Sequence, residues 1–147
     1  MIVISGYMSP EYAGDGIISL KSDIYSFGVI MMEIVSGKKN RGFSHEAHSH
    51  NLLGHVWKLY KEGNTLEVLN AFSVKSNHIS GSIQVGLLCV QHSPDDRPNM
   101  STMLSGKGQL AEPKKPGFYT GDTSGSSSTM ETQSTSNNVT VTLLDGR

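Results

Sequence analysis

Residues 22–37, SDIYSFGVIMMEIVSG, form the most apolar helical pattern in the chain. Ser22 is a typical N-cap, and Asp23 in the first turn is favoured by the helix dipole. Gly37 is a typical C-terminal stop. Only Glu33 is charged in the second half of the stretch, and a helix that is apolar on nearly every side belongs in the middle of a packed domain. We therefore expect a mostly α domain built around this helix.

Further helices are expected downstream. Residues 51–63 place five apolar side chains on one helical face: Leu52, Leu53, Val56, Trp57 and Tyr60. Residues 79–91 carry a second stripe, which Pro94 is expected to end: Ile79, Ile83, Leu87 and Val90. Thr65 is expected to cap a short turn through Leu69, and a last short helix is expected between Pro98 and Gly106. No strand is predicted before residue 139.

Two segments have too many turn formers or polar residues for a helix. Residues 5–16, SGYMSPEYAGDG, predict an ordered loop. Residues 120–138 are rich in serine and threonine and predict a disordered tether. Their side chains could accept phosphate, but composition alone does not predict phosphorylation. Residues 139–144, VTVTLL, alternate like a half-buried strand, and a lone strand needs an edge to join.

Composition excludes several classes of function. The chain has 147 residues, a net charge of −1 and a pI near 6.6, so no sequence-wide basic field predicts binding to nucleic acid or direct contact with a membrane surface. No apolar stretch approaches the roughly 20 residues that cross a bilayer. Cys89 is the only cysteine, which excludes an internal disulfide and a cysteine-rich zinc site and is compatible with a reducing compartment.

Some polar residues could form a metal site or a glycosylation site, but the sequence favours a simpler explanation for them. The spacing of His45, His48 and His50 is not that of a helical zinc motif and no cysteine is near, so a solvated loop is expected. Asn99 and Asn138 each begin a glycosylation sequon, although glycosylation is not expected. No metal site is predicted.

Three stretches occur in an order that resembles the second half of the large lobe of protein kinases: residues 6–13 (GYMSPEYA), 22–37 and 89–98 (CVQHSPDDRP). Ser9, Pro10 and Glu11 stand where kinases carry the A-P-E motif. The resemblance implies a buried ion pair between Glu11 and Arg97. It also makes Pro10, Glu11, Asp23, Gly28 and Arg97 structural residues of the lobe rather than catalytic ones.

The resemblance assigns Asp23 a role that depends on other residues. In the family this aspartate holds the backbone of the catalytic loop. Without those partners it either faces water or is a buried carboxylate that takes up a proton. An ordinary helix-terminus aspartate is the remaining alternative.

Other stretches resemble the plant S-locus or lectin-type receptor-like serine/threonine kinases, including their C-terminal tail: residues 36–43, 51–63, 86–101, 113–121 and 137–147. The resemblance implies the C-terminal portion of a kinase domain over residues 1–112 and the family tail over residues 113–147. It implies a cytoplasmic location, at the cytoplasmic side of the plasma membrane within a full receptor.

The catalytic elements of the family are not in this sequence. The Gly-rich loop, the strand lysine, the H-R-D loop and the D-F-G aspartate lie upstream in kinases, and none occurs here. The family binds ATP and magnesium through these elements. Because the elements do not occur in this sequence, we expect neither a bound cofactor nor kinase activity for this chain alone.

The match also has two departures. Val3 and Ile4 replace a Gly-Thr pair whose threonine lines the substrate-docking loop, which leaves Ile4, Gly6 and Tyr7 as a docking remnant. The residues after Ser101 provide less apolar helix than the family normally has, so the last helix is expected to be clipped and poorly packed.

Two functions remain open at this stage. The chain is either part of a longer kinase, whose activity belongs to the complete protein, or a non-catalytic interaction module. The partner of such a module would be an intact kinase or a kinase substrate. An apolar patch is expected where a covering segment is missing from the central helix.

Overall fold

A computed structural model describes residues 6–41, 51–69, 76–106 and 109–119. The elements in these ranges are all helical, with α denoting α-helices and η 3-10 helices: α1 (Pro10–Asp15), α2 (Leu20–Ser36), α3 (Leu52–Lys61), η1 (Thr65–Val68), α4 (Ser76–Cys89), η2 (Pro94–Asp96) and α5 (Met100–Ser105). One isolated antiparallel bridge joins Gln91 to Pro116. The expectation of a mostly α fold is confirmed.

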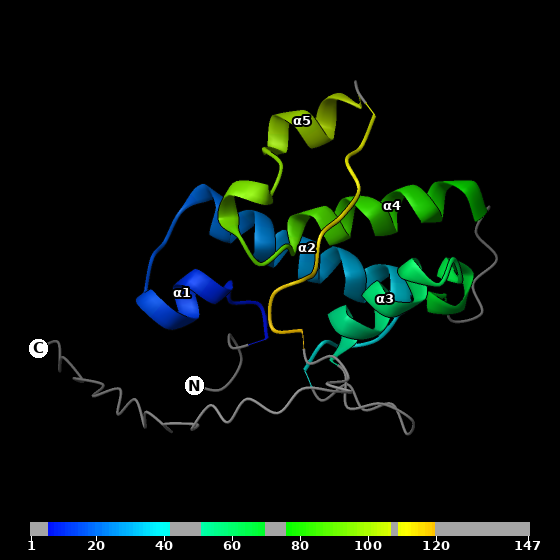
Figure 1. The fold of residues 1–147 in the computed structure, drawn as a ribbon, viewed down its shortest axis with the longest axis horizontal. Helices are drawn as coiled ribbons and strands as arrows, with labels where there is room; N and C mark the ends of the chain where they lie inside the picture. The colour runs from blue at the N-terminus through cyan, green and yellow to red at the C-terminus, as the bar shows by residue number, and fades with distance from the viewer. Residues whose placement is uncertain (1–5, 42–50, 70–75, 107–108, 120–147) are drawn as a thin grey trace, which may run out of the picture.

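Helix α2 lies at the centre and packs along α4, while α3 and η1 cover the other side of the same core (Figure 1). Among the described residues, the core consists of twelve buried side chains: Tyr25, Val29, Met32, Leu52, Leu53, Val56, Leu59, Val68, Ile79, Ile83, Leu87 and Val90. All four members of the stripe predicted on residues 79–91 are among them. On α3 the expected face is buried except that Trp57 and Tyr60 are only partly covered, and Leu59 joins the core instead.

Helices α2 and α4 approach each other closely at glycine. A Cβ placed on Gly28 would lie 2.6 Å from Cβ of Cys89 and 2.8 Å from Cγ1 of Val90. Such distances are shorter than side-chain contacts allow, so glycine at position 28 sets how closely the two helices pack.

One face of α2 is not covered by the described residues. Ile30 is 46% exposed and Ile34 is 76% exposed, and Phe27 on the same helix is also exposed. The loop before α2 adds exposed Ile17 and Ile18. The position of α2 at the core agrees with its apolar pattern, and its uncovered face agrees with the expected apolar patch.

The start of α2 differs from the prediction. Its N-cap is Ser19, not Ser22. The Ser19 side chain accepts a hydrogen bond from Ser22 N at 3.2 Å, and Ser22 Oγ accepts one from Ser19 N at 3.2 Å. This reciprocal capping box uses both serines, so the helix begins one turn earlier than expected. Asp23 lies in the first turn and Gly37 ends the helix in a left-handed conformation, both as expected.

The predicted loop over residues 5–16 contains a helix, α1, over half of its length. Pro10 is the first residue of α1, where its missing N–H is not needed, and Gly16 ends the helix with a φ of 68°. The proline and glycine that suggested a loop therefore stand at the two ends of a short helix.

Smaller differences occur at other helix ends. Helix α4 ends at Cys89, before Pro94, because the chain leaves the helix to pair Gln91 with Pro116. Pro94 instead begins η2. At η1 the N-cap is Asn64 rather than Thr65. Helix α5 ends at Gly106 as expected and contains no buried residue, which agrees with a poorly packed last helix.

Some predicted features lie outside the described residues. These are Ile4, the histidines at 45, 48 and 50, and the tail segments 120–138 and 139–144. In the ranges that the structure does describe, no helix is both long enough and apolar enough to cross a membrane.

Candidate functional site

The loop before α1 and the first turn of α1 meet α2 and the chain that follows α4. Two sets of polar contacts hold them together. One joins Glu11 to Arg97, and the other joins Tyr7 to Glu33. Between them lies a pocket that includes Asp23.

Glu11 and Arg97 form a bidentate ion pair. Arg97 donates from Nη1 to Oε1 at 2.7 Å and from Nη2 to Oε2 at 2.9 Å. The Arg97 side chain is fully buried, and that of Glu11 is 11% exposed. Two parallel hydrogen bonds to a carboxylate are among the strongest polar contacts in proteins. The pair expected from the sequence is present, and it fastens α1 to the segment after α4.

The remaining donors of Arg97 are also used. Nε donates to Gln91 O at 2.8 Å, Nη1 to Lys21 O at 2.9 Å and Nη2 to His92 O at 3.0 Å. All five N–H groups of the guanidinium therefore have acceptors. The ring of Tyr25 lies with its centroid 5.0 Å from Arg97 Cζ, a cation–π distance. Because every N–H group of the Arg97 guanidinium has an acceptor, its positive charge can be buried inside the protein.

Burial and the ion pair act on Glu11 in opposite directions. Burial is the largest single influence and alone would raise the pKa of the Glu11 carboxyl, but the hydrogen bonds from Arg97 and from the backbone, together with the positive charge of Arg97, lower the pKa to about 2. Glu11 is therefore ionised at neutral pH and is not a proton donor. This supports a structural role for the pair.

Tyr7 is anchored at the opposite end of the site. Its hydroxyl donates to Glu33, at 2.8 Å from Oε2 and 3.0 Å from Oε1. The backbone N of Asn40 donates to the same carboxylate at 2.9 Å, and Asn40 Nδ2 donates to Gly6 O at 2.9 Å. The hydrogen bond to Glu33 raises the pKa of the Tyr7 hydroxyl. These hydrogen bonds hold the segment after α2 against the loop before α1.

We expect Tyr7→Phe to lower the free energy of unfolding by about 1 kcal/mol, since it removes one hydrogen bond to a carboxylate that keeps its Asn40 partner. Urea unfolding measures the change. Tyr12→Phe is the matched control, because no hydrogen bond of the Tyr12 hydroxyl is present among the described residues. Equal stabilities of the two variants would contradict the role assigned to the Tyr7 contact.

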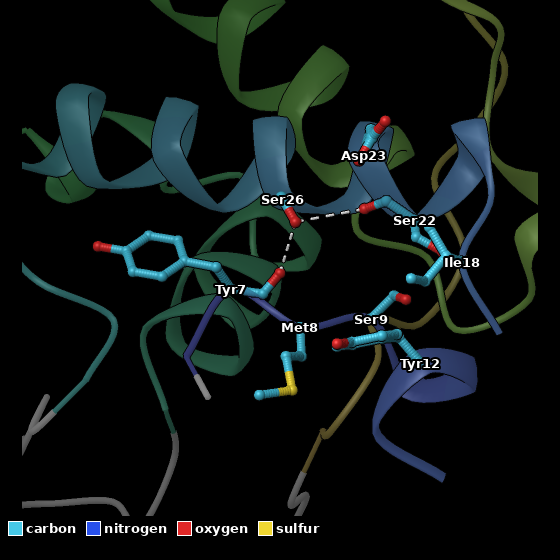
Figure 2. A pocket seen from close by; sticks show the side chains of 8 residues that line it. All are labelled: Tyr7, Met8, Ser9, Tyr12, Ile18, Ser22, Asp23 and Ser26. Atoms are coloured by element: carbon cyan, nitrogen blue, oxygen red, sulfur yellow. Dashed lines mark hydrogen bonds between the residues drawn. The ribbon is translucent and has the colours of Figure 1, made fainter. Parts of the chain in front are cut away.

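A pocket of about 160 Å³ lies between the loop before α1 and the first turns of α2 (Figure 2). Met8, Tyr12 and Ile18 supply its apolar walls. Ser26 Oγ donates to Tyr7 O at 2.7 Å and fixes the loop against α2. Figure 2 shows the Tyr7 ring turned away from Ser9 and Tyr12, towards the end of α2 that carries Glu33.

Asp23 lines the α2 side of this pocket and is exposed. The side chain faces water, so the alternative of a buried aspartate is wrong. An exposed carboxylate beside apolar walls can accept hydrogen bonds from backbone N–H groups of a chain that docks there. The family role of Asp23, to hold the catalytic loop, needs such a chain and stays a prediction.

Two of the hydroxyl groups that line the pocket are engaged in hydrogen bonds within the protein. The hydroxyls of Ser22 and Ser26 donate to oxygens nearby, and no histidine lines the pocket to act as their base. Across the ranges that the structure describes, no group of three histidine, cysteine or acidic side chains is placed to hold a metal ion. Burial raises the pKa of the Cys89 thiol to about 12, which keeps it unreactive.

Comparison with known proteins identifies the family to which this chain belongs. The family model described as "Protein tyrosine and serine/threonine kinase" matches residues 2–106, more than half of the chain. The chain belongs to the protein kinase family. A second model, described as "Domain of unknown function (DUF3403)", matches residues 105–147.

Curated relatives narrow this kinase family assignment. The chain is 44% identical over 162 residues to the G-type lectin S-receptor-like serine/threonine-protein kinase SRK of Arabidopsis thaliana, covering 97% of this chain and 19% of that protein. It is 44% identical over 158 residues to the receptor-like serine/threonine-protein kinase SD1-7 of the same plant, with the same coverage. The resemblance to plant receptor-like kinases of the S-locus and lectin type is confirmed. The chain spans about a fifth of the length of these relatives.

A solved structure shows the same kinase-like fold. The pseudokinase domain of BIR2, described as an immune regulator of the RLK/Pelle family, superposes with a TM-score of 0.59 at 29% identity. The match covers 69% of this chain and 31% of that one. The partial kinase-like fold is confirmed.

The structure brings together most of the residues singled out from the sequence. Gly6, Tyr7, Pro10 and Asp23 surround α1 and the first turns of α2, and Arg97 reaches Glu11 there. Gly28 stands apart, at the contact between α2 and α4. The roles that the kinase family implies for these residues stay predictions.

Sequence reasoning missed two residues of the site, Glu33 and Asn40. The sequence does contain a sign that Glu33 has a partner. It is the one charged residue in the second half of the apolar stretch 22–37, and a charged side chain on an apolar helix needs a polar partner. Nothing in the sequence marks Asn40, whose contacts depend on how the turn after α2 folds back.

Proposed function

We propose that this chain is the C-terminal part of a receptor-like serine/threonine kinase domain that contributes to protein phosphorylation only together with the rest of that domain. Alone it is catalytically inactive. The complete protein would use ATP and magnesium and act at the cytoplasmic side of the plasma membrane, as the family resemblance implies. The printed sequence contains none of the groups that position ATP or its metal ion.

The uncovered apolar face of α2 is the observation that carries this proposal. Ile30 and Ile34 are exposed on a helix whose opposite face is the centre of the core. A contiguous apolar face on a soluble chain marks an interface with another protein segment. The pocket beside Asp23 lies at the start of the same helix and supplies hydrogen-bond acceptors for that segment. We assign this face to the upstream half of a kinase domain.

The proposal predicts that the purified chain does not bind ATP with magnesium in calorimetry. A separate polypeptide that carries the upstream half of the SD1-7 kinase domain is expected to associate with the chain and to gain affinity for ATP. Measurable ATP binding by the chain alone would contradict its assigned inactivity.

The interface is tested with charged substitutions on the uncovered face. Ile30→Asp together with Ile34→Asp should abolish association with the upstream half, because burying two carboxylates opposes docking. Leu66→Asp, on η1, is the matched control, since this leucine is also exposed but lies off α2. Association that survives the α2 substitutions would reject this face as the interface.

A second function, a non-catalytic interaction module, is supported by the core itself. Eleven of the twelve buried core residues lie in four helical elements, α2, α3, η1 and α4, and Val90 directly follows α4. The structural relative BIR2 is itself a pseudokinase. Such a module would bind an intact kinase or a kinase substrate. Gel filtration and urea unfolding of the same preparation distinguish the two proposals: a monomer with one cooperative transition favours the module, and aggregation favours the fragment.

A further inference from the structure

An apolar groove lies on the α5 side of the molecule, apart from the pocket beside Asp23. Its volume is about 320 Å³, and it is lined by Phe27 and Met31 of α2, Val85 of α4, Met103 and Leu104 of α5, and Leu110. This volume lies within the range of protein sites that bind ligands. Leu104 is 79% exposed although it lines the groove. The groove exists because α5 is only six residues long and buries none of its side chains.

The segment that follows α5 forms one border of this groove. Residues 109–112 carry no helix or turn, and in Figure 1 the chain after α5 descends across α4. Gln84 Nε2 donates to Ala111 O at 3.1 Å and holds the segment in place. Within the part of the chain that the structure describes, the backbone N–H groups of Leu110 and Ala111 have no acceptor. An exposed backbone edge of this kind is where an added strand binds.

We propose that residues 139–144 of the chain's own tail, VTVTLL, dock in this groove as a strand beside residues 109–112. The alternation places Val139, Val141 and Leu143 on one side of a strand and Thr140 and Thr142 on the other. The first set fills the groove beside Leu104, and the threonines face water. A backbone carbonyl of the tail accepts from the N–H group of Leu110, because neighbouring residues of an extended segment present their N–H groups to opposite edges and the Ala111 carbonyl faces Gln84 of α4.

The occupant is chosen from the composition and length of the tail. Between residues 120 and 147 the apolar side chains are Met130 and those within 139–144, so the tail has one apolar stretch to bury. Nineteen residues lie between Tyr119 and Val139, so twenty steps along the chain join the two. At about 3.3–3.6 Å per extended residue they reach roughly 65–70 Å, well beyond the size of a domain with a radius of gyration near 13 Å.

Hydrogen exchange of the full chain, followed by mass spectrometry, tests this docking. Amides of residues 139–144 should exchange roughly tenfold or more slowly than in the variant Leu104→Asp, because the charge opposes burial of the tail in the groove. Leu20→Asp is the matched control, since Leu20 is 81% exposed and lies outside the groove. It should leave the slow exchange of the tail unchanged.

Each outcome decides the proposal. Slow exchange in the wild type and in Leu20→Asp, with fast exchange in Leu104→Asp, supports it. Unprotected tail amides in the wild type, or protection that Leu104→Asp leaves intact, overturns it. Protection that grows with protein concentration also overturns it, because the groove would then bind a second copy of the chain. None of these results bears on the upstream half of the kinase domain, because its docking is assigned to Ile30 and Ile34 of α2, and neither isoleucine lines the groove.

Discussion

Replacing Arg97 by methionine is expected to lower the free energy of unfolding by about 3–5 kcal/mol, the range for breaking a buried ion pair from one side. The Glu11 carboxylate would be left 11% exposed without its partner. Three backbone carbonyls, of Lys21, Gln91 and His92, would also lose their donor. Urea unfolding monitored by circular dichroism measures the change.

The pair formed by Lys114 and Asp96 is the matched control. Its charged atoms are 2.6 Å apart, but both side chains reach solvent. Lys114→Met is therefore expected to change the free energy of unfolding by no more than about 1 kcal/mol. A loss as small as this for Arg97→Met would show that the buried pair does not hold α1 in place.

The pH dependence gives the Arg97 prediction a second readout. The pKa of Glu11 is about 2 in the folded chain, against an ordinary value of 4.5. A lowered pKa contributes stability that is present above pH 4.5 and is lost as the pH falls towards 2. In Glu11→Gln this contribution is absent, so its stability should fall less steeply than that of the wild type over the same interval.

The sequence pattern identified the helices better than it identified their ends. Periodicity located α2, α3 and α4 because an apolar stripe recurs at helical spacing. The start of α2 was missed by one turn because Ser19 and Ser22 are both good caps and the structure uses both. The segment of α1 was predicted as a loop because proline and glycine are typical of turns, but here Pro10 begins the helix and Gly16 ends it.

Contacts between residues far apart in the sequence could be predicted only in part. Glu11 and Arg97 are 86 residues apart, and no periodicity connects them, so the pair was predicted from the family resemblance alone. Tyr7, Glu33 and Asn40 meet because the chain after α2 turns back on the loop before α1. The all-round apolar pattern of α2 likewise does not reveal which of its faces is covered.

Gly28→Ala is expected to destabilise the chain, by about 2 kcal/mol. The added methyl group would lie 2.6 Å from Cβ of Cys89 and 3.1 Å from Gly86 O. These atoms belong to the backbone of α4 or are attached to it, so they cannot rotate away, and α2 and α4 must separate. Overpacking of this kind costs about 1–3 kcal/mol. The contact at 2.6 Å places the cost of overpacking at or above the upper end of this range. The higher helix propensity of alanine offsets at most about 1 kcal/mol of that cost.

Gly81→Ala separates packing from helix propensity, because it makes the same chemical change in α4 with the opposite expected sign. A Cβ at Gly81 would have no atom within 4 Å. This variant therefore gains propensity without a clash and should be more stable than the wild type by up to about 1 kcal/mol. If both alanines stabilised the chain, α2 and α4 would have room to adjust. The close approach at Gly28 would then not be what keeps the kinase-like core packed.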